Sequence, residues 1–352
     1  MANQCQSLLQ ATLDMNHIDV NVEVVDDSYF EGCLTLESVH FGSCVRHIGH
    51  RAFANCSNLE TVVISPGVTH IESEAFKECE NLKTIDIPST VKSIGTSVFA
   101  YCTSLITADI YVHNGIISEA AFYKCISLAT VHIADAVHSI HDRSFSCCTS
   151  LQTITLPPML NSIGDNAFSN CKFVDVSIPH SVKHMGSGVF SNCGSLVAIE
   201  FTPLSGIEEL PEACFSNCVK LHKVELPRGI RVFKPYAFKG CVSIECVYAK
   251  HVRSIMKFCF LNCVNIKPVE YPHDTFIDKT AFDGCTRLQT TRKSTKGRIL
   301  SHNTVICPPQ DWLADHASIM RGTSHKSRTP GGNNIKVVRD KVSSKNIRRY
   351  FK

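Results

Sequence analysis

Cysteine and histidine are the residue types in this sequence that could bind a metal or act as nucleophile and base, with 19 and 17 copies in 352 residues. Twelve cysteines share one setting, the motif Phe-x-x-Cys, whose copies lie 22 to 25 residues apart. A thiol at the same place in every repeat predicts a packing role, because buried cysteine behaves as a small hydrophobic residue. The phenylalanines of the motif are Phe30, Phe53, Phe76, Phe99, Phe122, Phe145, Phe168, Phe190, Phe215, Phe238, Phe260 and Phe282.

The other cysteines and the histidines give no stronger sign of chemistry. Cys214 and Cys218, like Cys259 and Cys263, lie four residues apart, whereas zinc sites favour closer pairs joined by a second pair. The histidines fall mostly at unrelated positions of the repeat, which favours solvated faces. Gly-rich phosphate loops, nucleophile elbows and His-Glu-x-x-His motifs do not occur. The sequence therefore predicts a protein that is not an enzyme, with no metal and no cofactor.

The elements that position these residues are repeats of about 23 residues, clearest between Cys79 and Cys102. From Leu82 the chain reads Leu-x-x-Ile-x-Ile-Pro, which predicts a short strand ended by proline. From Val91 it reads Val-x-x-Ile-Gly-x-x-Val-Phe, a second short apolar segment. Neither half can bury its apolar face alone, so stacked copies with parallel strands are expected. After Cys171 one residue is lost, and Phe173 is expected to take the usual Leu place.

These motifs resemble the BspA-like leucine-rich-repeat family over about residues 18–288. The resemblance implies a β-rich leucine-rich-repeat solenoid of about twelve turns of 22–25 residues, with short parallel strands. Family members known for adhesion and protein binding imply a non-enzymatic interaction role. Many members carry secretion signals, but no apolar run here is long enough for a signal peptide or a membrane span. We therefore expect a cytoplasmic or nuclear protein with no transmembrane segment.

Four regions are expected along the chain. Residues 1–17 form an N-terminal cap, and residues 18–291 form the solenoid, which ends where core positions receive polar residues. Residues 292–321 form a C-terminal cap with a short helix from Asp311 to Met320. Residues 322–352 form a basic and largely disordered tail, because Gly, Ser, Asn, Lys and Arg dominate there.

Charge divides the chain near Thr291. Residues 292–352 hold 14 Lys and Arg against three Asp, a net charge of +11, and residues 1–291 hold a net charge of −8. The tail is a candidate site for nucleic acid or anionic lipid, and equally it is explained as a solubilising extension. Attraction between the tail and the acidic body is also expected. The candidate anion-binding residues are Lys336, Arg339, Lys341, Lys345, Arg348, Arg349 and Lys352.

The outward positions of the predicted strands offer a second candidate site. The second residue after the repeat Leu is mostly Thr, which suits a parallel sheet. The fourth residue is often acidic, and stacked like charges cost stability unless they serve a purpose. These acidic positions are explained most simply as a solvated strand face. The more specific alternative is a groove that binds a basic partner. The candidate partner-binding strip is Asp86, Asp109, His132, Glu200, Glu225, Tyr248 and Glu270.

The leading hypothesis is an intracellular protein-binding scaffold that uses the solenoid face, assisted by the basic tail. One alternative is a binder of nucleic acid or anionic membrane surfaces that acts through the tail. Another is a surface adhesin exported without a recognisable signal. The sequence leaves the partner, the pathway and the oligomeric state open.

Overall fold

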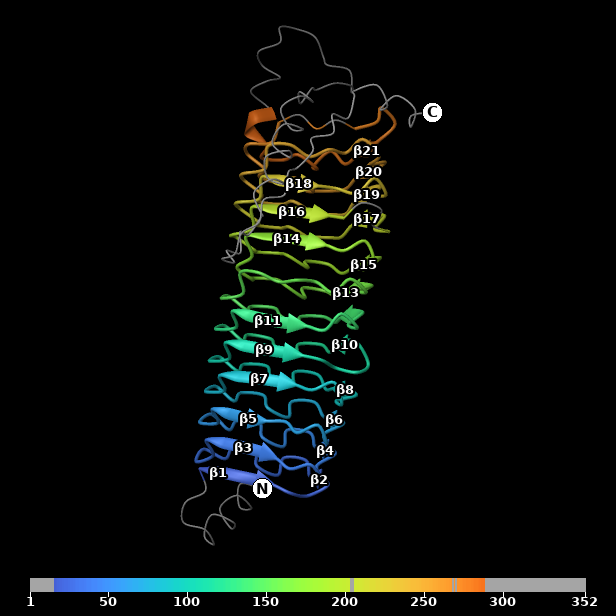
Figure 1. Cartoon of the computed structure of the whole chain (residues 1–352). Coiled ribbons are helices and arrows are strands. Elements are labelled where there is room, and N and C mark those ends of the chain that lie inside the picture. The colour runs from blue at the N-terminus through green and yellow to red at the C-terminus, as the bar shows by residue number, and fades with distance from the viewer. Residues whose placement is uncertain (1–15, 203–205, 268, 270, 289–352) are drawn as a thin grey trace, which may run out of the picture. The chain divides into compact units, whose positions relative to one another are not determined.

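The computed structural model describes residues 16–202, 206–267, 269 and 271–288. The expected helix at Asp311–Met320, the tail, and nearly all of the N-terminal cap lie outside these residues. Within them the chain is a stack of turns, most of which have one longer and one shorter strand, and Figure 1 shows the two ladders of strands running along the stack.

The longer strands form the long-strand sheet, in which each strand pairs in parallel with the strand one turn later. The alternation in Leu-x-x-Ile-x-Ile explains them: in β7, Ile85 and Ile87 are buried while Thr84 and Asp86 are exposed. The strands fall in two sheets, ordered β1-β3-β5-β7-β9-β11 and β14-β16-β18. Their bounds are β1 His17–Val20, β3 Ser38–Phe41, β5 Thr61–Val63, β7 Thr84–Ile87, β9 Thr107–Ile110, β11 Thr130–Ile133, β14 Asp175–Ile178, β16 Ala198–Phe201 and β18 Lys223–Glu225.

The shorter strands form the short-strand sheet, in three groups of four. Each has two residues, and the second is an aliphatic or aromatic core residue, as in β8, where Ile94 is buried and Ser93 half-exposed. Their bounds are β2 Val24–Val25, β4 His47–Ile48, β6 His70–Ile71, β8 Ser93–Ile94, β10 Ile116–Ile117, β12 Ser139–Ile140, β13 Ser162–Ile163, β15 His184–Met185, β17 Glu209–Leu210, β19 Val232–Phe233, β20 Ser254–Ile255 and β21 Phe276–Ile277.

A ladder of stacked phenylalanine rings occupies the core between the turns. The twelve repeat phenylalanines form eleven consecutive pairs, with ring centroids 5.0 to 5.9 Å apart and interplanar angles of 1 to 22°. Phe173 is fully buried and meets Phe168 and Phe190 edge-on, so its predicted replacement of the repeat Leu is confirmed. Each ring buries a large apolar area only when its neighbours are present, so the turns stabilise one another.

In each of the first eleven turns two residues adopt the left-handed backbone conformation. One lies two places before the repeat Phe, and the other lies two places after it. In one turn these are Arg51, with φ 55°, and Asn55, with φ 61°. Their N–H groups donate to carbonyls of the next turn, at Ser73 and Lys77, with N···O distances of 3.1 and 2.8 Å. Glycine and asparagine tolerate this conformation best. Accordingly, most turns carry one of them at the second position, namely Gly32, Asn55, Asn170, Asn192, Asn217, Gly240, Asn262 and Gly284.

Glu78 occupies the same left-handed position with φ 61°, and its replacement is expected to stabilise the protein. Glu78→Gly should raise the free energy of unfolding by about 1 kcal/mol, because a side chain in this conformation is strained. The matched control is Glu80→Gly, two residues on and outside the left-handed set, which should lower it by roughly 0.5 to 1 kcal/mol. Urea unfolding measures both, and an equal loss in the two variants would contradict the assignment.

The predicted β-rich solenoid of short parallel strands is confirmed, with local departures in two turns. Residues 244–249 form no strand beyond an isolated bridge at Tyr248. Residues 151–157 form no strand, although Leu151 and Leu156 are buried at the expected core positions. This turn therefore separates the two parts of the long-strand sheet. Within the described residues, helix is limited to 286–288, and no helix there is long and apolar enough to cross a membrane.

Candidate functional site

The repeat cysteines form a ladder of thiol hydrogen bonds along the core. From the second turn on, each Sγ–H donates to the carbonyl oxygen of the repeat Phe one turn earlier; Cys125, for example, donates to Phe99 over 3.1 Å. The Phe99 carbonyl also accepts the N–H of Cys102 in its own turn, over 3.2 Å. Cysteine suits this place because it is small and apolar yet carries a weak donor. The donors are Cys56, Cys79, Cys102, Cys125, Cys148, Cys171, Cys193, Cys218, Cys241, Cys263 and Cys285.

Burial keeps these thiols protonated. Desolvation raises the pKa of Cys193 and of Cys241 to about 12, and that of the less buried Cys285 to about 11. Cys214 and Cys259 are buried just before a repeat Phe, and desolvation raises their pKa values well above the usual range. Because the thiolate is the form that attacks substrates and binds metals, these thiols are poor candidates for either task. Their burial and hydrogen bonds confirm the packing role predicted from their spacing.

Thiol reactivity should separate the ladder from Cys44, which is exposed. In the folded protein, iodoacetamide at pH 8 is expected to label Cys44 more than about 100-fold faster than Cys102 or Cys125, because the buried thiols are protonated and screened. In denaturant all three should react at similar rates. Peptide mapping by mass spectrometry measures the rates, and ladder labelling in the folded protein at the rate of Cys44 would contradict this account.

A shallow hollow on the short-strand sheet brings acidic and imidazole groups together. Its lining includes Glu119, His141, Asp142 and His184. The Oδ1 atom of Asp142 accepts the backbone N–H of Asp165 over 2.7 Å, so this carboxylate ties one turn to the next. No group of three or more His, Cys, Asp or Glu side chains suited to a metal ion occurs in the part of the chain that the structure describes.

The outward face of the long-strand sheet presents three columns of side chains. At the start of the strands two successive N–H groups share one carbonyl of the previous turn: Ala129 and Thr130 both donate to Ile106, over 2.9 and 3.1 Å. Because of this bulge-like pairing, two neighbouring residues at the start of the strand both point outward. The alternation of the strand then makes the residue two places after the second of them point outward as well. The first, second and third columns are therefore the residues one, two and four places after the repeat Leu.

The third column contains the partner-binding strip predicted from the sequence. Asp86 and Asp109 are register partners in β7 and β9, as are Glu200 and Glu225 in β16 and β18. His132 is the register partner of Asp109 and forms an ion pair with it through Nδ1. The structure thus stacks these strip residues in adjacent turns.

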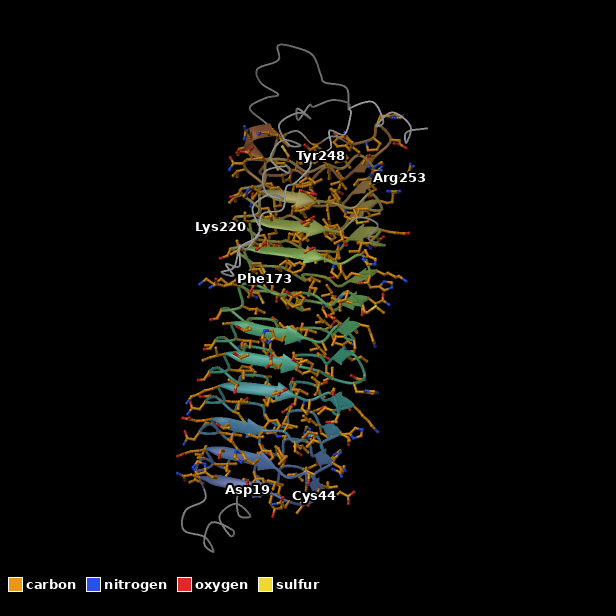
Figure 2. All side chains as sticks on the ribbon, viewed as in Figure 1. Asp19, Cys44, Phe173, Lys220, Tyr248 and Arg253 are labelled. Carbon is orange, nitrogen blue, oxygen red and sulfur yellow. The ribbon has the colours of Figure 1, made fainter. Side chains whose placement is uncertain are left out.

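Within the described residues the third column runs from Asp19 to Tyr248, both labelled in Figure 2. At the first end, His40 lies 3.6 Å from the Asp19 carboxylate, so the pairing of His with Asp recurs there. Asp19 and His40 were not among the predicted site residues, although their position in the repeat is the same. The predicted Glu270 and all seven tail residues lie outside the described residues, and their roles stay predictions.

The first column was missed by the sequence analysis. Strict alternation of the strand does not predict that the residue after the repeat Leu points outward. The carbonyl shared by two N–H groups shows that it does. Its charged members pair from turn to turn: Lys83 with Glu60 over 2.5 Å, and Lys267 with Glu245 over 2.6 Å. The hydrogen bond from Lys267 lowers the pKa of Glu245. The exposed apolar residue Ile106 could have marked the column, because it breaks the run of charged residues at this place.

Comparison with known proteins identifies a repeat family and similar folds. The BspA-type leucine-rich repeat region, in six copies, matches residues 4–106, 115–245 and 170–289. A leucine-rich repeat protein from Bacteroides ovatus is 24% identical, with a TM-score of 0.57 and coverage of 77% of this chain and 85% of that chain. A leucine-rich repeat protein from Eubacterium ventriosum is 22% identical, with a TM-score of 0.52 and coverage of 77% and 83%.

A leucine rich cell surface protein from Faecalibacterium prausnitzii is 27% identical, with a TM-score of 0.43 and coverage of 73% of this chain and 88% of that chain. No curated protein matches the chain. The Bacteroides and Eubacterium structures support the same stacked-turn fold.

Proposed function

Because this chain belongs to the BspA-type leucine-rich repeat family, we propose that it is a non-enzymatic protein-binding scaffold. Its binding surface is the outward face of the long-strand sheet. Repeat arrays of this kind offer extended surfaces for binding, because their stability comes mainly from the core residues that pack between turns.

The observation that carries this proposal is the exposure of large apolar side chains on the face. Ile106 is 51% exposed and Val174 46% exposed, both in the first column. Exposed apolar groups beside polar ones are typical of surfaces that bind other proteins. Asp86 and Asp109 stack in register, an arrangement that costs stability in the free protein and is relieved by a basic partner.

We place this function inside the cell. Eleven buried thiols donate hydrogen bonds to carbonyls of the preceding turn. A reducing compartment keeps such thiols intact, whereas oxidation would remove the donors. The basic tail adds electrostatic attraction for partners that carry phosphate or other acidic groups.

Affinity capture from the source cell, with the full chain and with a chain ending at residue 291, tests whether the solenoid is the binding part. Protein partners retained by both forms support the proposal. If every partner is lost with residues 292–352, and nuclease or anionic vesicles remove the binding to the full chain, the tail is the binding part and the proposal is wrong.

A further inference from the structure

We propose that the face of the long-strand sheet binds an extended polypeptide segment with an apolar centre and basic residues at both ends. This inference rests on the proposed function, because it names the partner class of the same face. Three features of the face carry it: an uncharged strip, carboxylates at the two ends of that strip, and the absence of Lys and Arg between them.

The uncharged strip lies in the middle of the first column. On either side of it the column is charged and self-neutralised, by Lys83 with Glu60 and by Lys267 with Glu245. The strip itself crosses five turns without a charge. Its members are Ile106, Ala129, Gln152, Val174 and Val197.

Most of the strip is open to solvent. Ala129 and Gln152 are exposed, like Ile106 and Val174, and Val197 is half-buried. Four of the five side chains are apolar, on both sides of Gln152, and such a row along the axis of the stack can bury side chains of a segment that crosses the strands.

Carboxylates flank the strip in the neighbouring third column. Asp109 lies in the first turn of the strip and Asp86 one turn before it, and Glu200 lies in the last turn and Glu225 one turn after it. Among the residues that the structure describes, no cation pairs with Asp86 or Glu200. These two carboxylates can accept charge-assisted hydrogen bonds from Lys or Arg of a partner.

The three columns hold no Lys or Arg in the five turns from Ile106 to Glu200, and their acidic residues there are Asp109, Asp175 and Glu200. A nucleic acid or an acidic segment would therefore meet mainly like charge on this part of the face, where the one imidazole, His132, already contacts Asp109. A second copy of this chain, face to face, would oppose acidic ends to acidic ends, which repel at short range.

The spacing of the turns sets the length of the segment. Asp86 and Glu200 are five turns apart, and parallel strands lie about 4.8 Å apart, which gives about 24 Å. An extended segment advances about 3.3 Å per residue, so its two basic ends lie about seven positions apart, with about six residues between them. The partner pattern is thus one or two basic residues, a mainly apolar run of about six, and one or two basic residues.

A random-peptide phage library of about twelve residues, selected on the immobilised full chain, tests the inference without assuming a partner. We expect enrichment of peptides with this basic–apolar–basic pattern. The enriched peptide is then synthesised with a fluorophore, and its affinity is measured by anisotropy. Its binding should weaken at least tenfold between about 0.1 and 1 M salt, because the end contacts are ionic.

Two charge-reversal variants then locate the site. The double variant Asp86→Lys, Glu200→Lys should weaken binding of the peptide by tenfold or more. The control Asp26→Lys, Asp135→Lys makes the same change in net charge at exposed positions outside the three columns and should leave the affinity within about twofold. Ile106→Ser with Val174→Ser should also weaken it, with the melting temperature unchanged.

The outcomes separate this inference from the proposed function. Selected peptides that depend on the face but lack the basic–apolar–basic pattern overturn the inference and leave the proposed function standing. If none of the face variants changes peptide binding, or if the library yields no enrichment, the result counts against both the inference and the proposed function. Enrichment of peptides that match the chain's own face would instead identify a second copy as the occupant and also overturn the inference.

Discussion

Ile94→Asp is expected to unfold the turns around β8 and not merely to loosen one side chain. Ile94 is only 4% exposed, in the column of core residues that the short strands supply. An unpaired carboxylate in this dry stack costs several kcal/mol, a large share of the stability of the turns on either side. Because the turns depend on their neighbours for burial, the damage should spread over more than one repeat.

Ser93→Asp is the matched control, since Ser93 is the other residue of β8 and is half-exposed. It should change the melting temperature by no more than a degree or two. Hydrogen exchange should show lost protection from β6 to β10 in the Ile94 variant alone. An unchanged melt for Ile94→Asp would mean that this column faces water and that the stacking order is wrong.

Alkaline pH is expected to unfold the protein steeply. Desolvation raises the pKa of twelve buried thiols. Above the unfolded value of about 8.5, an unfolded thiol loses its proton while the folded thiol keeps it. The unfolded state then binds fewer protons, so the free energy of unfolding falls as pH rises.

Each thiol contributes about 1.4 kcal/mol per pH unit in this window, and twelve together contribute roughly 16 kcal/mol per unit. Thiol titration removes no stability below about pH 8.5. At this slope, the roughly 5 to 15 kcal/mol that stabilises a typical folded protein should be lost within roughly one to two units above that pH. Circular dichroism against pH, in the presence of a reductant, measures the transition.

Lysine and tyrosine also titrate at high pH, so a variant isolates the thiol contribution. Cys102→Ala, Cys125→Ala and Cys148→Ala together remove three of the twelve thiols and should make the fall in stability about a quarter shallower. A pH dependence identical to that of the unchanged protein would show that these thiols do not remain protonated in the fold.

The stacking order and the core columns could be predicted from the sequence because each column repeats one residue type. Twelve copies of Phe-x-x-Cys fix which residues meet across turns, and Phe173 could be placed because the lost residue shifts the register by one. The third column followed from alternation alone. Its acidic members therefore lie in adjacent turns, as Asp86 and Asp109 do.

The rest depends on backbone geometry that alternation does not contain. The first column points outward because two N–H groups share one carbonyl, so Ile106 and Val174 did not enter the predicted site. At many left-handed positions the sequence carries Asn or Gly, as at Asn55 and Asn170, and these residues could have indicated the conformation. Glu78 and Lys124 adopt the same conformation, but their residue types do not indicate it. The missing strand at residues 151–157 has no counterpart in the pattern, which continues through it.

The most direct test of protein binding by the long-strand face is quantitative affinity capture with two matched variants of the full chain. Ile106→Ser with Val174→Ser alters the face, and Ile126→Ser with Met159→Ser alters residues that are 45% and 65% exposed outside the three columns. The account predicts that captured protein partners fall at least tenfold with the first variant and persist with the second. Equal capture by both variants and the unchanged chain would contradict it.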